Sequence, residues 1–241
     1  MARLLHSKTP RYRLLMPKEL TILLSIAVAA LTTACSDDDD TYQYGDFRYD
    51  MVTYTGSDSY GRATFEMLQR DDTGLITLIT ADACSMSTDT GQRMLLQYVP
   101  AGDVDDGVQI ITPQGYTLAV TDTLRYTDHD AISTLAMDSI KLKSIWRTGD
   151  YLNISCQVKY TTEARYLNLV MDYDTRHNDT VHCYLYHDML GQTAYFWRQS
   201  YLSFYVGEAW NLESCSTMRI HLTDVTYPDV SYYDFTKGMF Y

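Results

Sequence analysis

The sequence predicts an all-β protein of two domains, a small barrel followed by an antiparallel β-sandwich. The 241 residues contain many short runs in which apolar and polar side chains alternate, the pattern of strands with one buried face. Turn signals separate these runs, as they do in barrels and sandwiches. Tyrosine occurs 22 times, and aromatic and β-branched residues favour strands.

The first predicted domain covers residues 42–130. Its strand candidates are residues 47–55, 61–69, 75–80, 93–99, 108–111 and 116–120. In the second of these, Ala63, Phe65 and Met67 share one face, and Asp71-Asp72-Thr73-Gly74 predicts the turn that follows. Five or six strands in a segment of this length predict an OB-like barrel.

The second predicted domain covers residues 133–241 and follows a boundary near residues 128–138, where residues 130–138 are either a short helix or an extended connector. Its strand candidates are residues 139–147, 152–160, 166–172, 181–187, 193–199, 201–206 and 218–223. Gly149-Asp150 and Leu190-Gly191-Gln192 predict hairpin turns. Trp146 follows Ile140 and Ile145, and we expect its ring to enter the core of the sandwich.

The first 35 residues have the pattern of a lipoprotein signal peptide. Residues 20–30 are an apolar run of the length of a signal-peptide core, preceded by Lys18. Thr32-Thr33-Ala34-Cys35 then places small residues before a cysteine, so Cys35 is the predicted lipidation site and the lipid is the predicted contact with the membrane. The alternative is an ordinary cleaved secretory peptide. The start of the natural chain is open between Met1 and Met16.

An acidic run follows the cysteine directly and forms a predicted tether over residues 36–41. It resembles the export signal that sends Bacteroidetes lipoproteins to the outer leaflet of the outer membrane, and its residues are Ser36, Asp37, Asp38, Asp39 and Asp40. The resemblance implies a protein exposed at the cell surface. The alternative interpretation is a solvated linker without a sorting role.

The charge of the chain disfavours nucleic acids and anionic lipid surfaces as partners. Loss of residues 1–35 removes five basic residues and Glu19, so the net charge changes from −12 to −16. Residues 42–130 contain 14 acidic and 5 basic residues, so the predicted barrel lacks the cationic groove that tracks a nucleic-acid strand.

Four cysteines remain after Cys35, namely Cys84, Cys156, Cys183 and Cys215. Their spacing does not form a dense disulfide framework, and the last three lie in or beside strand candidates. We therefore favour buried free thiols, which pack as small apolar groups. A single disulfide between Cys156 and Cys183 is the alternative, and metal ligation is a third interpretation.

Three segments of the second half resemble successive strands of NigD-like lipoproteins. They are residues 143–154, residues 166–170, and residues 181–188 with Gly191 after them, and the likeness is strongest from Trp146 to Asn153. The resemblance implies an OB-like barrel followed by a β-sandwich. It also implies an immunity role, suggested by a bacteriocin operon, although the family has no established biochemical activity.

Motifs of common catalytic or metal sites do not occur in the sequence, so we predict no catalytic residue, no metal and no cofactor. Residues 103–107 have the oxygen-rich side chains of a calcium loop but lack its later glutamate, and we interpret them as a polar turn. Four histidines, at positions 177, 182, 187 and 221, could meet across strands, but we favour the interpretation that each is a separate solvent-side or edge side chain.

Aromatic side chains on the outer faces of strands are the candidate ligand contacts. Tyr184 and Tyr186 alternate with apolar residues, and so do Tyr201 and Tyr205, while Trp210 is a candidate surface contact in a loop. Exposed aromatic rings bind sugars and peptides at a small entropic cost. Alternatively, these tyrosines serve as strand formers on covered faces.

These observations favour a non-catalytic lipoprotein that binds a glycan, peptide or protein at the cell surface. An immunity-type protein that neutralises a toxin is the alternative, motivated by the family resemblance. A hydrolase with dispersed carboxylates is a third hypothesis, because carboxylate pairs leave no local motif.

Overall fold

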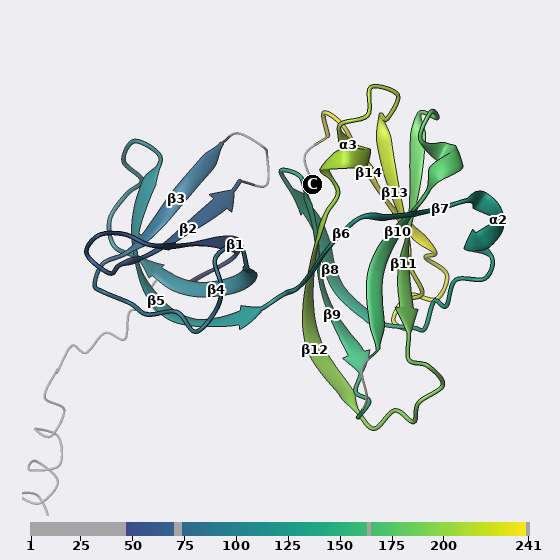
Figure 1. The fold of residues 1–241 in the computed structure, drawn as a ribbon, viewed down its shortest axis with the longest axis horizontal. Coiled ribbons are helices and arrows are strands. Elements are labelled where there is room, and N and C mark those ends of the chain that lie inside the picture. The colour runs from purple at the N-terminus through teal and green to yellow at the C-terminus, as the bar shows by residue number, and fades with distance from the viewer. Residues whose placement is uncertain (1–46, 70–73, 163–164, 240–241) are drawn as a thin grey trace, which may run out of the picture. The chain divides into compact units, whose positions relative to one another are not determined.

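The computed structural model describes residues 47–69, 74–162 and 165–239. The predicted signal peptide, Cys35 and the acidic residues 36–40 lie outside these ranges. The described chain is all-β, as predicted, with a closed barrel followed by two further sheets (Figure 1). Its helices are short, and within the described ranges none combines the length and apolarity needed to cross a membrane.

Five strands form the barrel in the order β1-β2-β3-β5-β4, and β4 pairs with β1 to close it. This arrangement confirms the predicted OB-like barrel. The strands are β1 (Arg48–Ser57), β2 (Ala63–Leu68), β3 (Leu75–Thr80), β4 (Arg93–Pro100) and β5 (Val108–Leu118).

Strand β5 replaces the two separate strands expected over residues 108–111 and 116–120. The register shift opposite Gln97 and Tyr98 accommodates Pro113 and Gly115 within one strand. The first part of β5 pairs with β3, and most of the strand pairs with β4. One bulged strand therefore joins the two sides of the barrel.

Alternating side chains from all five strands fill the barrel. The buried residues are Val52, Tyr54, Ala63, Phe65, Ile76, Leu78, Met94, Leu96, Tyr98 and Ile111. Met67, Cys84 and Met86 pack against them from the edge. The predicted inward face of β2 is correct, because Ala63 and Phe65 are fully buried.

Two sheets form the sandwich, one with the strand order β14-β13-β11-β10-β7 and the other with the order β6-β12-β9-β8. The strands are β6 (Val120–Thr123), β7 (Arg125–Thr127), β8 (Lys141–Thr148), β9 (Tyr151–Lys159), β10 (Tyr166–Asp172), β11 (Thr180–Asp188), β12 (Trp197–Tyr205), β13 (Thr217–His221) and β14 (Tyr232–Thr236). Strand β12 is continuous where two strands were expected, and β14 was not predicted.

The sandwich is mixed rather than antiparallel throughout. Strands β7 and β10, β6 and β12, and β11 and β13 pair in parallel. After β11 the chain crosses to the other sheet as β12 and returns as β13, so β13 runs beside β11 in the same direction. The prediction of an antiparallel sandwich was wrong for these three pairs.

The sandwich also begins earlier in the chain than the expected limits of 42–130 and 133–241 place it. Strands β6 and β7, which we assigned to the first domain, are edge strands of the two sandwich sheets. Between β5 of the barrel and β6 of the sandwich lies one buried residue, Ala119, whose N–H donates to the carbonyl of Arg93 at 3.0 Å. The expected connector is α2 (His129–Ile132) followed by irregular chain.

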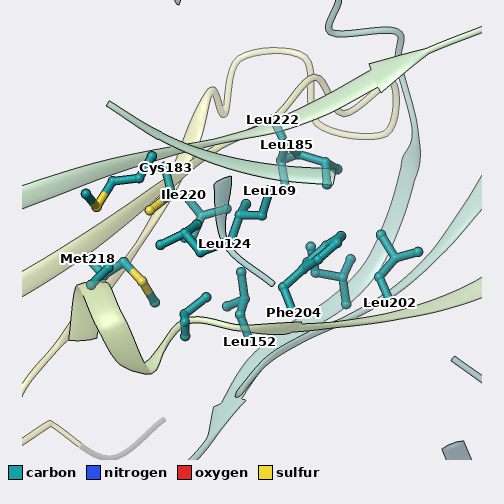
Figure 2. Close-up of a cluster of buried hydrophobic side chains, with 14 of the residues drawn as sticks. Leu124, Leu152, Leu169, Cys183, Leu185, Leu202, Phe204, Met218, Ile220 and Leu222 are labelled. Carbon is teal, nitrogen blue, oxygen red and sulfur yellow. The ribbon is translucent and has the colours of Figure 1, made fainter. Parts of the chain in front are cut away.

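The core of the sandwich lies between its two sheets (Figure 2). Leu152, Ile154, Cys156 and Val158 of β9 face it, as the alternation predicted, and Phe204 and Leu202 of β12 lie beside them. Within the described ranges all four cysteines are free. Burial raises the pKa of Cys156 to about 12, so this thiol stays protonated and packs as an apolar group.

The two predicted turns differ in what they connect. Gly149, with a φ of +54°, and Asp150 form the two-residue hairpin between β8 and β9. Leu190 and Gly191 also have positive φ angles, but they follow β11 and lead to β12 in the other sheet. The prediction of a hairpin at this second turn was wrong.

Candidate functional site

The outer face of the five-stranded sheet carries a group of half-exposed imidazole and aromatic side chains. Strand β11 contributes His182, Tyr184 and Tyr186, because Val181, Cys183 and Leu185 face the core. Strands β13 and β14 pair so that Arg219 lies opposite Asp234 and His221 opposite Tyr232. We call these seven residues the histidine–tyrosine face: His182, Tyr184, Tyr186, Arg219, His221, Tyr232 and Asp234.

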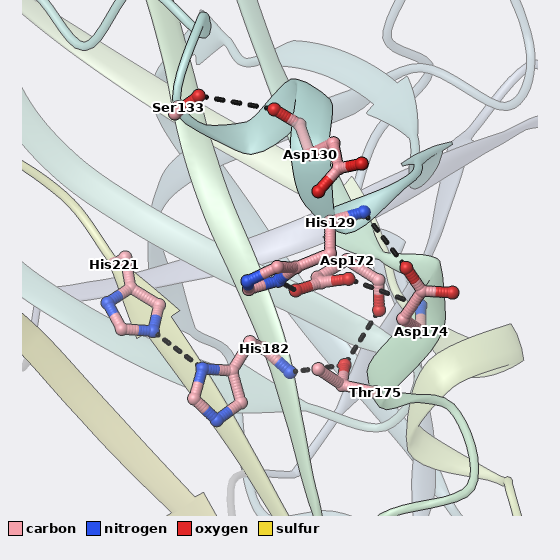
Figure 3. A network of polar contacts seen from close by, with 8 residues as sticks. All are labelled: His129, Asp130, Ser133, Asp172, Asp174, Thr175, His182 and His221. Atoms are coloured by element: carbon pink, nitrogen blue, oxygen red, sulfur yellow. Dashed lines mark hydrogen bonds and ion pairs between the residues drawn. The ribbon is translucent and has the colours of Figure 1, made fainter.

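The imidazole of His221 lies at the centre of this face. Its Nε2 atom is 3.1 Å from Nδ1 of His182 (Figure 3), and the ring of Tyr184 stacks on it with centroids 4.4 Å apart and an interplanar angle of 9°. The ring of Tyr232, on β14, has its centroid 5.9 Å from that of His221. A hydrogen bond between two imidazoles requires a donor nitrogen and an acceptor nitrogen, so the pair fits the neutral state of at least one ring.

The surroundings of the two histidines disfavour their protonation. Burial first, then the neighbouring His182 and Arg219, lower the pKa of His221 to about 4. Burial and Arg219 also lower the pKa of His182. Both imidazoles are therefore neutral at neutral pH.

An ion pair holds the edge of the face in place. The guanidinium of Arg219 donates two hydrogen bonds of 2.7 Å to the carboxylate of Asp234, and it lies 3.9 Å from the centre of the Tyr232 ring. The hydrogen bonds from Arg219 lower the pKa of Asp234. A bidentate pair of this kind fixes both side chains, so the edge is rigid and polar.

A third histidine lies close to the pair but has a different environment. His129 of α2 places Nδ1 2.6 Å from the carboxylate of Asp172, at the end of β10, and its backbone N–H donates to Asp174 at 3.1 Å (Figure 3). The bond to Asp172 raises the pKa of His129. Asp172 is buried and His129 is exposed, so the imidazole covers a carboxylate that would otherwise face solvent.

The five predicted aromatic contacts do not form one surface. Tyr184 and Tyr186 lie on the histidine–tyrosine face, and Tyr166 stacks on Tyr186 with centroids 6.4 Å apart. Tyr201 and Tyr205 belong to the outer face of the other sheet. The rings of Tyr205 and Tyr151 are in contact, with centroids 5.6 Å apart. Because the two predicted pairs of tyrosines lie on the outer faces of different sheets, they cannot contact a single small ligand.

Tyr201 and Trp146 line one cavity of about 430 Å³ together with Tyr49 and Leu95 of the barrel. Trp146 lies opposite Asn153 in the β8–β9 pair, on the side of the sheet away from the sandwich core, and it is only partly buried. The expectation that Trp146 enters the core was wrong, because the register shift between Leu142 and Ser144 changes which side chains of β8 face inward.

Trp210 lies at the end of α3 (Gly207–Trp210) and is half-buried against the sandwich core. The guanidinium of Arg147 lies 4.0 Å from the centre of its indole ring. This contact covers part of the ring that was expected to face a ligand. Trp210 therefore has both a packing role and an exposed edge.

Sequence reasoning missed the central residue of the face. The histidines were interpreted as separate side chains, but His182 and His221 meet because β11 and β13 are parallel neighbours. Of the other two, His177 is exposed, and His187 is fully buried with Nδ1 2.8 Å from the carbonyl of Asp138. The pairing of β11 with β13 was the missing information.

The face presents groups that can stack on a ligand and form hydrogen bonds with it. In the described part of the chain, groups of three or more His, Cys, Asp or Glu side chains that could hold a metal ion do not occur. Two imidazole nitrogens alone fall short of the three or four protein ligands of a zinc site. Rings, an ion pair and a neutral imidazole pair remain as contacts for a ligand.

The depressed pKa of His221 predicts a loss of stability at acidic pH. Between pH about 6.5 and about 4 the unfolded state binds a proton that the folded state does not, so the free energy of unfolding falls as the pH decreases. We expect the His221 share of this loss to be about 1 kcal/mol after solvent screening. His221→Phe, which keeps the ring stack, should remove that share.

Urea denaturation at pH 7, 5.5 and 4.5 measures this effect. His177→Phe is the matched control, because His177 is exposed and is not part of the histidine–tyrosine face. Equal pH dependence in the wild type and in His221→Phe would contradict the prediction.

Comparison with known proteins supports the fold and identifies the second domain. Residues 123–236 match the family model described as the NigD-like C-terminal beta sandwich domain. Comparison of the sequence with curated proteins gives no significant match.

Solved structures of three Bacteroides proteins have the same fold. A protein of unknown function from Bacteroides vulgatus has a TM-score of 0.63 and 18% identity, over 80% of this chain and 92% of that chain. A NigD-like immunity protein from Bacteroides caccae has a TM-score of 0.52 and 21% identity, over 79% and 92%. A candidate lipoprotein from Bacteroides fragilis has a TM-score of 0.53 and 12% identity, over 80% and 98%.

These solved structures thus share the fold of this chain, and the match extends over 92% of the Bacteroides vulgatus protein and 92% of the Bacteroides caccae protein. The family model identifies residues 123–236 as a NigD-like C-terminal beta sandwich domain.

Proposed function

We propose that the protein is a non-catalytic lipoprotein of the outer membrane that binds a glycan, peptide or protein at the cell surface. The observation that carries this proposal is the histidine–tyrosine face, where half-exposed rings are stacked in fixed positions beside an ion pair. Rigid aromatic side chains lose little entropy on binding.

Direct binding measurements test the role of this face. Purified full-length protein in mild detergent is exposed to an array of glycans and peptides, and each hit is titrated. We expect Tyr184→Ala combined with Tyr232→Ala to weaken binding about tenfold, because both side chains contact His221. Tyr60→Ala is the control, since this barrel residue is 77% exposed. Binding that survives the double substitution would exclude this face.

An immunity role is the second candidate, and the similar structure described as a NigD-like immunity protein favours it. Under this proposal the ligand is a toxin protein. Cells that lack the gene would be challenged with the bacteriocin encoded nearest to it, and complemented with the wild type or the Tyr184→Ala, Tyr232→Ala variant. Survival that is independent of complementation would exclude the immunity role.

The lipid anchor rests on Thr32-Thr33-Ala34-Cys35 and is supported by the likeness to a candidate lipoprotein. We expect Cys35→Ser to release the protein from membranes, because the thiol is the attachment site of the acyl chains that provide the anchoring free energy. Labelled palmitate incorporation and membrane fractionation measure this. A variant that stays labelled and membrane-bound would contradict the anchor.

The acidic run supports the proposed surface location. Replacement of Asp37 to Asp40 by alanine should leave lipidation unchanged but reduce digestion by protease added to whole cells, since a sorting signal acts after the lipid is attached. Immunoblots of protease-treated cells measure the exposed fraction. Unchanged digestion would show that the acidic run is only a tether and has no sorting role.

A further inference from the structure

One end of the four-stranded sheet carries a second group of side chains that the proposed function does not use. The start of β8, the end of β9 and the start of β12 meet there, and Lys159 pairs directly with Trp197. We call the following residues the basic aromatic end: Lys141, Lys159, Tyr160, Arg165, Phe196, Trp197 and Arg198.

Cations and aromatic rings alternate closely in this group. The ammonium groups of Lys141 and Lys159 lie 4.5 and 5.6 Å from the centre of the Trp197 ring. Tyr160 and Phe196 stack with centroids 4.9 Å apart and an interplanar angle of 11°. The guanidinium of Arg198 lies 6.0 Å from the Tyr160 ring, and Phe196 is 58% exposed.

The positive charge of this end is not neutralised by the described part of the chain. Elsewhere, Arg62, Arg125 and Arg219 form ion pairs with aspartates. Among the described residues no carboxylate forms an ion pair with Lys141, Lys159, Arg165 or Arg198. Burial and the charge of Arg198 lower the pKa of Arg165, as expected where like charges gather.

The chemistry of these groups restricts the ligand. Flat rings bind the apolar faces of sugars, and ammonium or guanidinium groups beside them bind carboxylates. The protein as a whole is strongly acidic. A nucleic acid or an anionic bilayer is larger than the basic aromatic end, so it would also face the acidic surface around that end and be repelled by it. A sugar chain with widely spaced carboxylates can contact the basic end alone.

We propose that the basic aromatic end binds an acidic polysaccharide, with a sugar ring on Trp197 and uronate carboxylates on Lys141 and Lys159. This site lies on the opposite sheet from the histidine–tyrosine face. It is therefore independent of the binding role proposed for that face.

Titration of full-length protein in mild detergent with polygalacturonate tests the proposal. At about 20 mM salt we expect binding that weakens at about 150 mM salt, because salt screens exposed charges. Lys141→Gln with Lys159→Gln should weaken binding about tenfold and reduce its salt dependence. Trp197→Ala should weaken binding while its salt dependence is kept, since it removes a ring and no charge.

Matched controls separate this site from general charge effects. Arg125→Gln with Lys237→Gln removes the same charge outside the basic aromatic end and should leave binding unchanged. Tyr184→Ala should also leave it unchanged, so failure of the histidine–tyrosine face and failure of this proposal are distinguishable. Circular dichroism and thermal unfolding confirm that each variant is folded.

Four outcomes would overturn the proposal. They are no binding of polygalacturonate at low salt, an equal loss in the control pair, equal binding of neutral dextran, and equal or tighter binding of single-stranded DNA or of phosphatidylglycerol vesicles. Preference for polygalacturonate together with loss in both the lysine pair and Trp197→Ala would support it.

Discussion

Phe204→Ala is expected to lower the free energy of unfolding of the sandwich by about 3–5 kcal/mol. Phe204 lies on β12, is fully buried, and packs among the side chains of both sheets (Figure 2). Its removal leaves a cavity that the surrounding strands cannot fill, because their positions are fixed by hydrogen bonds on both sides. A loss of this size is a large share of the stability of a typical domain.

Trp146→Ala serves as the comparison, since it removes a larger side chain from a position outside both cores. We expect it to cost about 1–2 kcal/mol, because the ring is only partly buried and lines a cavity. Chemical denaturation of the full-length protein measures both. A cost for Trp146→Ala equal to that of Phe204→Ala would show that the ring stabilises the fold as a core residue does.

The faces of the strands could be predicted from the sequence because alternation is local. Leu152 and Val158 are buried on one face of β9, and Tyr184 and Tyr186 lie on the outer face of β11, as expected. A strand fixes this pattern by its own geometry, whichever strands become its neighbours. The same reasoning failed for Trp146, where a bulge in β8 changed the alternation.

Partners and directions of strands depend on contacts between distant segments, which alternation does not encode. Residues 120–123 and 125–127 form two short, mostly exposed edge strands, so neither strand has an alternating buried pattern that would assign it to the sandwich. β14 was missed because Tyr232 and Asp234 face outward and leave few apolar positions in its five residues.

The candidate site was predictable only in part for the same reason. Tyr184 could be placed on an outer face from the sequence of β11 alone. Its stacking on His221 requires β13 to lie beside β11 as a parallel neighbour, and the sequences of the two strands do not predict this pairing. The separation of Tyr184 from Tyr201 likewise follows from the assignment of β11 and β12 to different sheets.

Arg93→Ala is expected to lower the free energy of unfolding by about 3–5 kcal/mol, because it removes a fully buried side chain that joins the barrel to the sandwich. Arg93 of β4 donates to Thr53 of the barrel at 3.1 Å, and to Ser203 and Asn153 of the sandwich at 3.0 and 3.1 Å. Its guanidinium also lies 4.2 Å from the centre of the Tyr151 ring.

The charge of Arg93 is retained despite its burial, which lowers its pKa to about 10. In the described surroundings it has no carboxylate partner, since its three hydrogen bonds go to neutral oxygens. Desolvation of the charge therefore offsets much of what these bonds contribute. We therefore predict that the volume of the Arg93 side chain contributes more to the free energy of unfolding than its charge does.

Arg93→Met tests that balance, because methionine keeps most of the volume and removes the charge. The sandwich oxygens retain other partners: Ser203 donates to Asn153 at 2.8 Å, and the Asn153 amide donates to Thr148 at 2.8 Å. We therefore expect Arg93→Met to cost no more than about 1.5 kcal/mol. Arg93→Lys keeps the charge, but its ammonium cannot reach the three acceptors that the guanidinium fork spans, so it should cost more than Arg93→Met. Urea denaturation of the full-length variants ranks the three, and Arg93→Met as unstable as Arg93→Ala would show that the hydrogen bonds outweigh the cost of burying the charge.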